Sequence, residues 1–140
     1  MTHSHALVWM DSREAHVFRF NADDVEMERI KAHMPSRKVH HKAGVIGAGH
    51  AGSDTEFFEQ ILDALHGTQE WILAGPGVAK QALVGFMEGH KTGNSHVSSL
   101  HSLLARVEAM DHPTDGELVK HARAAFKAID RLQPNSPPPR

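Results

Sequence analysis

The chain has 140 residues, of which 40% are hydrophobic and 23% charged, and its formal net charge is −2 with histidine neutral. This composition is typical of one soluble globular domain and not of a protein that coats nucleic acid. The absence of cysteine excludes disulfides, thiolate zinc sites and cysteine nucleophiles. No apolar run approaches the ~20 residues of a membrane helix, and Met1–His5 has no secretory-signal pattern. We therefore expect a cytoplasmic protein without a membrane partner.

Three short strands are predicted at the start of the chain. His5–Met10 is apolar, Ala15–Phe20 alternates, and a short polar connector lies between them, which is typical of a β-hairpin. Val25–Lys31 alternates again after a second turn, so a third strand is predicted there. Three strands joined by short turns form an antiparallel meander.

A long loop is predicted at 32–52, where the periodicity stops; loops of this length are uncommon in compact domains and are usually functional or disordered. The loop contains no Asp or Glu and carries basic and histidine residues, namely Arg37, Lys38, His40, His41, Lys42 and His50. Its flexibility is expected to come from Gly44, Gly47, Gly49 and Gly52. Because neutralised phosphates release counterions, we expect this loop to bind RNA. A merely solvated loop is the structural alternative.

Helices and strands alternate in the rest of the chain. The Ser-x-x-Glu pattern at Ser53 predicts a helix that begins there and ends before Gly67. Further elements are predicted in the order strand Trp71–Ala74, helix Val78–Met87, helix Val97–Leu104 (ambiguous in type), strand Arg106–Met110, and a last helix behind a capping box at Thr114 and Glu117. The single domain is expected to span 1–133, and the Pro-rich end, 134–140, is expected to be a disordered tail.

This order of elements predicts the fold class. Antiparallel strands followed by alternating helices and strands indicate a mixed α/β sheet with helices on its faces. The same order is that of the ribonuclease-H-like fold, so we expect a ribonuclease-H-like mixed sheet.

Thirteen histidines raise the question of a metal site. His40 and His41 are adjacent, and Asp111, His112 and Asp115 offer further nitrogen and oxygen ligands of the kind that zinc or manganese accepts. However, adjacent side chains in an extended chain point to opposite sides, and the sequence has no His-x-x-x-His pair. Surface histidines are therefore the favoured interpretation, and we expect neither a metal nor a cofactor.

Catalytic chemistry has one candidate set, Asp11, Asp111 and His112. Enzymes of the ribonuclease-H type hold metal ions with several carboxylates, and Asp11 ends the first predicted strand. An Asp–His pair can also transfer protons. The structural alternatives are a turn role for Asp11 and a capping role for 111–117. These alternatives are favoured, so we expect no enzyme, although a metal-dependent nuclease or hydrolase stays open.

Three segments, His5–Ser12, Trp71–Lys80 and Arg106–Phe126, together with a second strand ending near Phe20, carry a family resemblance. They resemble the middle domain of the archaeal and eukaryotic class-1 release factor and Pelota family. The chain is also similar to small bacterial single-domain proteins labelled translational machinery components. The resemblance covers about 6–132 and consists of element order and short apolar signatures. It implies a domain that contacts the ribosome or structured RNA through the basic loop.

The motif that cuts peptidyl-tRNA is missing from the matching region. Release factors carry Gly-Gly-Gln in the long loop, whereas 47–52 here is Gly-Ala-Gly-His-Ala-Gly, and Gln60 falls in the following predicted helix. Pelota-type relatives also lack this motif and still occupy the ribosome, and we expect no room in these 140 residues for a stop-codon-reading domain. We therefore expect a non-catalytic ribosome- or RNA-binding protein. A nuclease, or a self-associating protein-interaction domain that forms homo-oligomers, is the alternative.

Overall fold

A computed structural model describes residues 4–21, 23–32 and 46–131 of the chain. Within these ranges the elements are β1 His5–Met10, β2 Glu14–Phe20, β3 Val25–Lys31, α1 Ile46–Asp63, β4 Glu70–Gly75, α2 Ala79–His90, α3 Ser95–Leu103, β5 Leu104–Ala109 and α4 Asp115–Arg131. The tail predicted at 134–140 lies outside them. None of the helices in the described ranges is long and apolar enough to cross a membrane.

The five strands form one mixed sheet in the order β3-β2-β1-β4-β5. The first three pair antiparallel, as the predicted meander requires. β4 then pairs parallel with β1, and β5 pairs parallel with β4, so β1 lies at the centre of the sheet. The expected α/β fold with a ribonuclease-H-like mixed sheet is confirmed.

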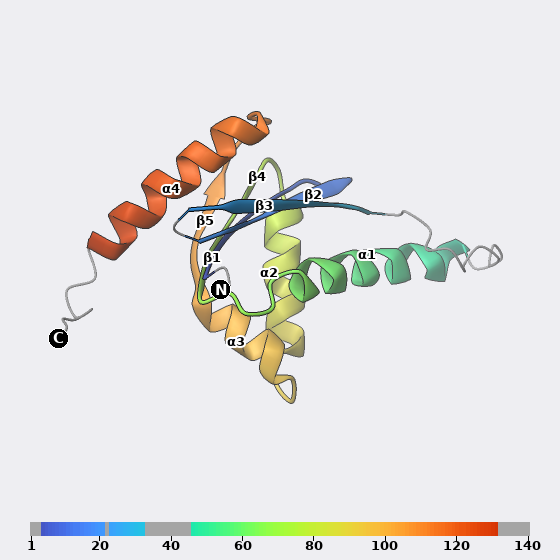
Figure 1. Cartoon of the computed structure of the whole chain (residues 1–140). Coiled ribbons are helices and arrows are strands. Elements are labelled where there is room, and N and C mark those ends of the chain that lie inside the picture. Colours follow the sequence, from blue (N-terminus) through green and yellow to red (C-terminus); the bar gives the residue numbers. More distant parts are fainter. Residues whose placement is uncertain (1–3, 22, 33–45, 132–140) are drawn as a thin grey trace.

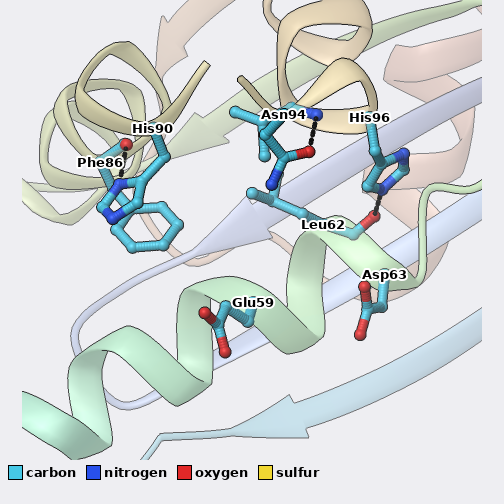
Figure 2. A pocket seen from close by; sticks show the side chains of 8 residues that line it. Glu59, Leu62, Asp63, Phe86, His90, Asn94 and His96 are labelled. Atoms are coloured by element: carbon cyan, nitrogen blue, oxygen red, sulfur yellow. Dashed lines mark hydrogen bonds between the residues drawn. The ribbon is translucent and has the colours of Figure 1, made fainter. Parts of the chain in front are cut away.

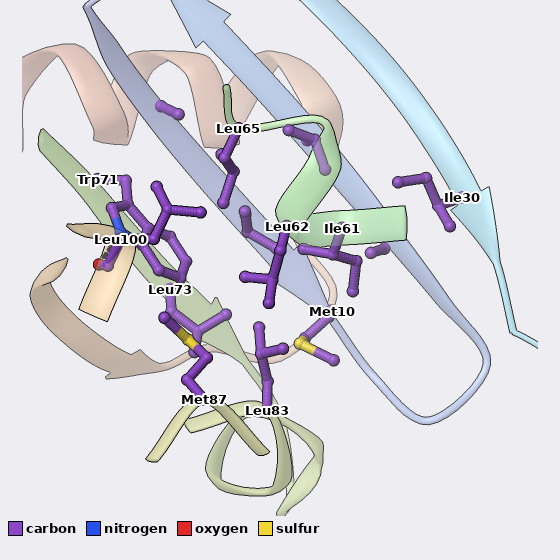
Figure 3. Close-up of a cluster of buried hydrophobic side chains, with 14 of the residues drawn as sticks. Met10, Ile30, Ile61, Leu62, Leu65, Trp71, Leu73, Leu83, Met87 and Leu100 are labelled. Atoms are coloured by element: carbon purple, nitrogen blue, oxygen red, sulfur yellow. Dashed lines mark hydrogen bonds between the residues drawn. The ribbon is translucent and has the colours of Figure 1, made fainter. Parts of the chain in front are cut away.

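Two hydrophobic clusters lie on opposite faces of this sheet. Helices α1, α2 and α3 cover one face, and α4 lies across the other (Figure 1). Figure 3 shows the first cluster, which includes Ile61 of α1, Leu65 in the turn after α1, and Trp71 and Leu73 of β4. Leu118 and Phe126 of α4 belong to the second cluster. Each large side chain that is fully buried contributes about 1.5–3 kcal/mol to stability.

The apolar run in β1 reflects burial on both faces. Ala6, Val8 and Met10 belong to the cluster under α1–α3, whereas Leu7 and Trp9 belong to the cluster under α4. Because successive side chains of a strand point to opposite faces, a strand that is covered on both sides needs apolar residues at every position. β3 at the edge of the sheet shows the opposite pattern, since most of its side chains are exposed.

The start of α1 corrects one prediction. The helix begins at Ile46 and not at Ser53, so the predicted loop 32–52 was wrong for its last part, and Gly47, Gly49, His50 and Gly52 are helical. The missing amphipathic pattern indicated a loop, but glycine in a helix costs only about 1 kcal/mol per residue. Once the following turns have formed, each additional helical residue gains one hydrogen bond. The intervening alanines favour the same extension.

The sharp turn after β4 depends on Gly75. Its φ is +148°, and a Cβ atom there would overlap the carbonyl oxygen of Met10 on the neighbouring strand. The Gly75 carbonyl also accepts a hydrogen bond of 3.1 Å from the Met110 amide. Gly77 in the same turn has φ +64°, but a Cβ there would meet no atom within 4 Å. Both glycines have a positive φ, but only Gly75 also lies too close to a neighbouring strand for a side chain.

We predict that Gly75→Ala destabilises the protein much more than Gly77→Ala. The first substitution combines an unfavourable φ with a backbone clash, and we expect a loss of about 3 kcal/mol or more. The second adds only the left-handed backbone penalty of about 1–2 kcal/mol. Urea denaturation followed by circular dichroism measures both losses, and equal losses would contradict the close approach of Gly75 to Met10.

Candidate functional site

The predicted basic loop lies mostly outside the described residues. This holds for Arg37, Lys38, His40, His41, Lys42 and Gly44. The structure does fix where the segment begins and ends, because β3 ends at Lys31 and α1 begins at Ile46. In Figure 1 the end of β3 and the start of α1 both lie at the right of the view. His50 and the three glycines at 47, 49 and 52 belong to α1 instead of to a loop.

Two of the alternative catalytic residues, Asp11 and His112, lie together at the end of β1. Asp11 Oδ2 is 3.5 Å from His112 Nε2. However, Asp11 Oδ1 accepts hydrogen bonds from the amides of Arg13 (2.8 Å) and Glu14 (3.0 Å). These bonds form the turn between β1 and β2, as expected for an Asp that bonds to the backbone two residues later. The third candidate, Asp111, has an exposed side chain, and its backbone carbonyl accepts a 2.9 Å bond from the Trp9 indole.

The pKa of Asp11 reflects these opposing surroundings. Partial burial raises the pKa, but the two amide donors and His112 outweigh this effect, and the pKa lies below its usual value. The carboxylate form is therefore the one that the turn stabilises. A general acid at neutral pH needs the opposite shift, and the two amide bonds within its own turn favour a structural role for this carboxylate.

Further histidine contacts join α4 to the sheet beside this pair. His16 Nδ1 lies 2.8 Å from Asp115 in the first turn of α4, and its Nε2 lies 3.3 Å from Glu14. The Trp9 ring packs edge-on against the rings of His16 and His112, with centroids 5.5 and 5.1 Å apart. These contacts attach the start of α4 to the sheet, which favours a structural role over a catalytic one for the residues in them.

A second cluster, which the sequence reasoning missed, lies between α1 and α3. Asp63, His66 and His96 each place one potential ligand atom within 4.8 Å of the other two. Asp63 is the last residue of α1, His66 follows in the next turn, and His96 lies in the first turn of α3. The three-residue spacing of Asp63 and His66 was visible in the sequence. Nothing in the sequence linked them to His96, because only the fold brings α3 beside the end of α1.

His96 is held in place by two neighbouring groups. Its Nε2 donates a 2.8 Å hydrogen bond to the carbonyl oxygen of Leu62, which fixes the orientation of the ring. Asn94 caps α3 by accepting a 3.1 Å bond from the Val97 amide. The rings of His66 and His96 stack with centroids 3.9 Å apart and planes 9° apart.

A shallow pocket of about 240 Å³ adjoins this cluster. Asp63 and His96 line one end of it, and His90 lies at the other end with its Nδ1 2.9 Å from the Phe86 carbonyl oxygen (Figure 2). Glu59 faces the same pocket from one turn earlier on α1 (Figure 2). The pocket therefore presents two carboxylates and two imidazoles on a partly apolar floor.

Solved structures of translation factors share the fold of this chain. A Thermoplasma acidophilum Pelota protein matches with a TM-score of 0.56 and 16% identity over 91% of this chain and 34% of that chain. Dom34 of S. cerevisiae, described as a translation termination-like factor, matches with a TM-score of 0.54 and 16% identity over 91% of this chain and 35% of that chain. The archaeal translation termination factor aRF1 matches with a TM-score of 0.50 and 17% identity over 92% of this chain and 39% of that chain.

At 16–17% identity, these matches establish a shared fold only. The chain spans about a third of the length of the solved proteins that it matches. No protein-family model matches its sequence, and no curated protein sequence does so.

We predict that Asp11→Ala lowers the free energy of unfolding by about 1–2 kcal/mol at pH 7, because two turn hydrogen bonds are lost. Asp11→Asn keeps an oxygen acceptor and loses only the charge, so its effect should be smaller. The folded pKa of Asp11 lies below the unfolded one. The stabilisation from the charge is therefore complete above roughly pH 5 and is lost as the pH falls through the folded pKa.

Urea denaturation of wild type and Asp11→Asn between pH 7 and pH 3 measures this dependence. The difference in stability should shrink toward pH 3. A difference that stays constant over this range would show that the charge of Asp11 does not stabilise the turn.

Proposed function

We propose that this domain acts in translation by binding the ribosome or structured RNA in the cytoplasm, without catalysing a reaction. The observation that supports this most is the fold itself. Pelota, Dom34 and aRF1 share it, and aRF1 and Dom34 are named as translation termination or termination-like factors. A shared fold is an analogy and not a demonstration of function, so the proposal also needs support from the residues of this chain.

The charge distribution supplies that support. The net charge of the chain is −2, yet no Asp or Glu occurs between Arg29 and Ser53. Arg37, Lys38 and Lys42 thus form a cationic segment, with His40 and His41 between them, in the connection from β3 to α1. Attraction to phosphates depends on local charge, because salt screens charges more than about 8–10 Å away. An acidic remainder therefore does not prevent this segment from contacting RNA.

The lack of a hydrolytic residue supports the non-catalytic part of the proposal. Segment 47–52 contains no glutamine, and it is helical within α1. Gln60 lies a further two turns along the same helix. Asp11, the best carboxylate candidate for metal-dependent cleavage, is bound to the amides of its own turn. Binding, and not cleavage, is the activity that these residues favour.

We predict that the triple variant Arg37→Glu, Lys38→Glu, Lys42→Glu no longer pellets with ribosomes. Each cation that neutralises a phosphate contributes about 1 to the slope of log K against log salt. The slope should therefore fall by about 3 at salt concentrations where binding is still measurable. Co-sedimentation of the purified protein with ribosomes across a salt series measures both quantities, and the melting temperature should stay nearly unchanged.

A matched control separates local from overall charge. Arg13, Lys120 and Lys127 are exposed in the structure, and their reversal to Glu changes the net charge by the same amount. This control should pellet like wild type. Equal loss in both triple variants would mean that only overall charge matters, and unchanged binding of the first would remove the basic segment from the interface. Metal-dependent RNA cleavage that is lost in Asp11→Asn would favour the nuclease alternative.

A further inference from the structure

We propose that Asp63, His66 and His96 bind a divalent zinc ion between the end of α1 and the start of α3. Two imidazole nitrogens and one carboxylate oxygen form a ligand set that zinc accepts in proteins. The three ligand atoms lie within 4.8 Å of one another. This site is separate from the basic segment, and it does not depend on the function proposed above.

His96 has the arrangement expected of a zinc ligand. A histidine bound to metal usually donates its second ring N–H to a carboxylate or backbone carbonyl, which fixes the tautomer and the ring orientation. The bond of 2.8 Å from His96 Nε2 to the Leu62 oxygen provides this contact. In the neutral form of the ring, this tautomer has its lone pair on Nδ1, the atom through which His96 would bind the ion. The Asn94 cap fixes the first turn of α3, and so fixes the backbone that carries the ring.

Asp63 and His66 are the two ligands whose side chains are free to change rotamer. Both are exposed, so their side chains can rotate without disturbing the core. Zinc–ligand bonds of about 2.0–2.1 Å in a tetrahedral site place the ligand atoms roughly 3.4 Å apart. To reach this spacing the His66 ring would tilt out of its stack on His96, and the Asp63 carboxylate would turn toward the two rings.

The electrostatic surroundings also favour a cation. Asp63 is the last residue of α1, and the carbonyl groups at a helix C-terminus carry partial negative charge. The last turn of α1 contains no basic residue. Glu59 adds a second carboxylate on the side of the pocket. With three protein ligands, a zinc ion would keep one coordination position for water or a small anion, and two of the ligands, Asp63 and His96, line the adjoining pocket of about 240 Å³.

The test is a zinc titration of the full chain, without a polyhistidine tag, against a competing chromogenic chelator. Wild type is expected to bind one zinc ion tightly. His66→Ala and Asp63→Asn should each weaken binding by about 100-fold, since each removes one of three ligands. Both residues are exposed, so these variants should remain folded, and circular dichroism checks this. His90→Ala is the matched control, because His90 lines the same pocket but is not in the cluster, and it should change affinity less than about threefold.

A second measurement does not depend on the chelator. Zinc at about 100 times its dissociation constant should raise the melting temperature of wild type by about 5–10 °C and that of Asp63→Asn by no more than about 2 °C. Equal zinc affinity in wild type, His66→Ala and Asp63→Asn would overturn the proposal. Loss of binding in a His40→Ala, His41→Ala variant, with binding retained in His66→Ala, would also overturn it, because the ion would then belong to the basic segment. Absence of tight zinc binding to wild type would do the same.

Discussion

Parallel pairing of β1 with β4 places two strands that are buried on both faces side by side in the middle of the sheet. Helices must cover both faces of this pair, because otherwise one set of large apolar side chains would face water. The two hydrophobic clusters are the direct result, and the outer strands can then be more polar. The chain leaves the pair at Gly75, where β4 approaches the Met10 carbonyl more closely than any side chain would permit. After this turn the chain enters α2 at Ala79. The Gly75 carbonyl also accepts a hydrogen bond from the amide of Met110, the residue that follows β5.

Polar contacts attach α4 to the sheet around the rim of its apolar stripe. His16 contacts Asp115 at the start of the helix, and His121 Nε2 lies 2.6 Å from Glu108 on β5. The Arg123 guanidinium lies over the Phe20 ring, 5.2 Å from its centroid. Several of the chain's histidines thus have a structural explanation as partners of carboxylates. The stacked pair His66 and His96 differs from these, since the two rings meet each other, with the Asp63 carboxylate beside them.

Local patterns in the sequence were sufficient for most of the fold. The alternation of Ala15–Phe20 and the apolar run Trp71–Ala74 predicted two strands correctly, and the capping box at Thr114 and Glu117 forms both of its reciprocal bonds, of 2.9 and 3.1 Å. The start of α1 could not be predicted in this way, because helix extension through Gly47 and Gly49 depends on the turns that follow. The zinc ligands were also out of reach, since His96 meets Asp63 only after α2 has reversed the chain. By contrast, the turn role of Asp11 was visible from its position between two strands.

Helix α1 connects the hydrophobic core to the segment that carries the basic residues. Its 18 residues span about 27 Å. Phe57 and Ile61 anchor its second half in the core, while its first residue, Ile46, directly follows the segment that carries the basic residues. The packing of Phe57 and Ile61 on the sheet therefore sets the direction in which α1 leads back to the cationic segment. An ion held by Asp63 and His96 would join the opposite end of this helix to α3, so the proposed metal site and the basic segment belong to the two ends of one helix.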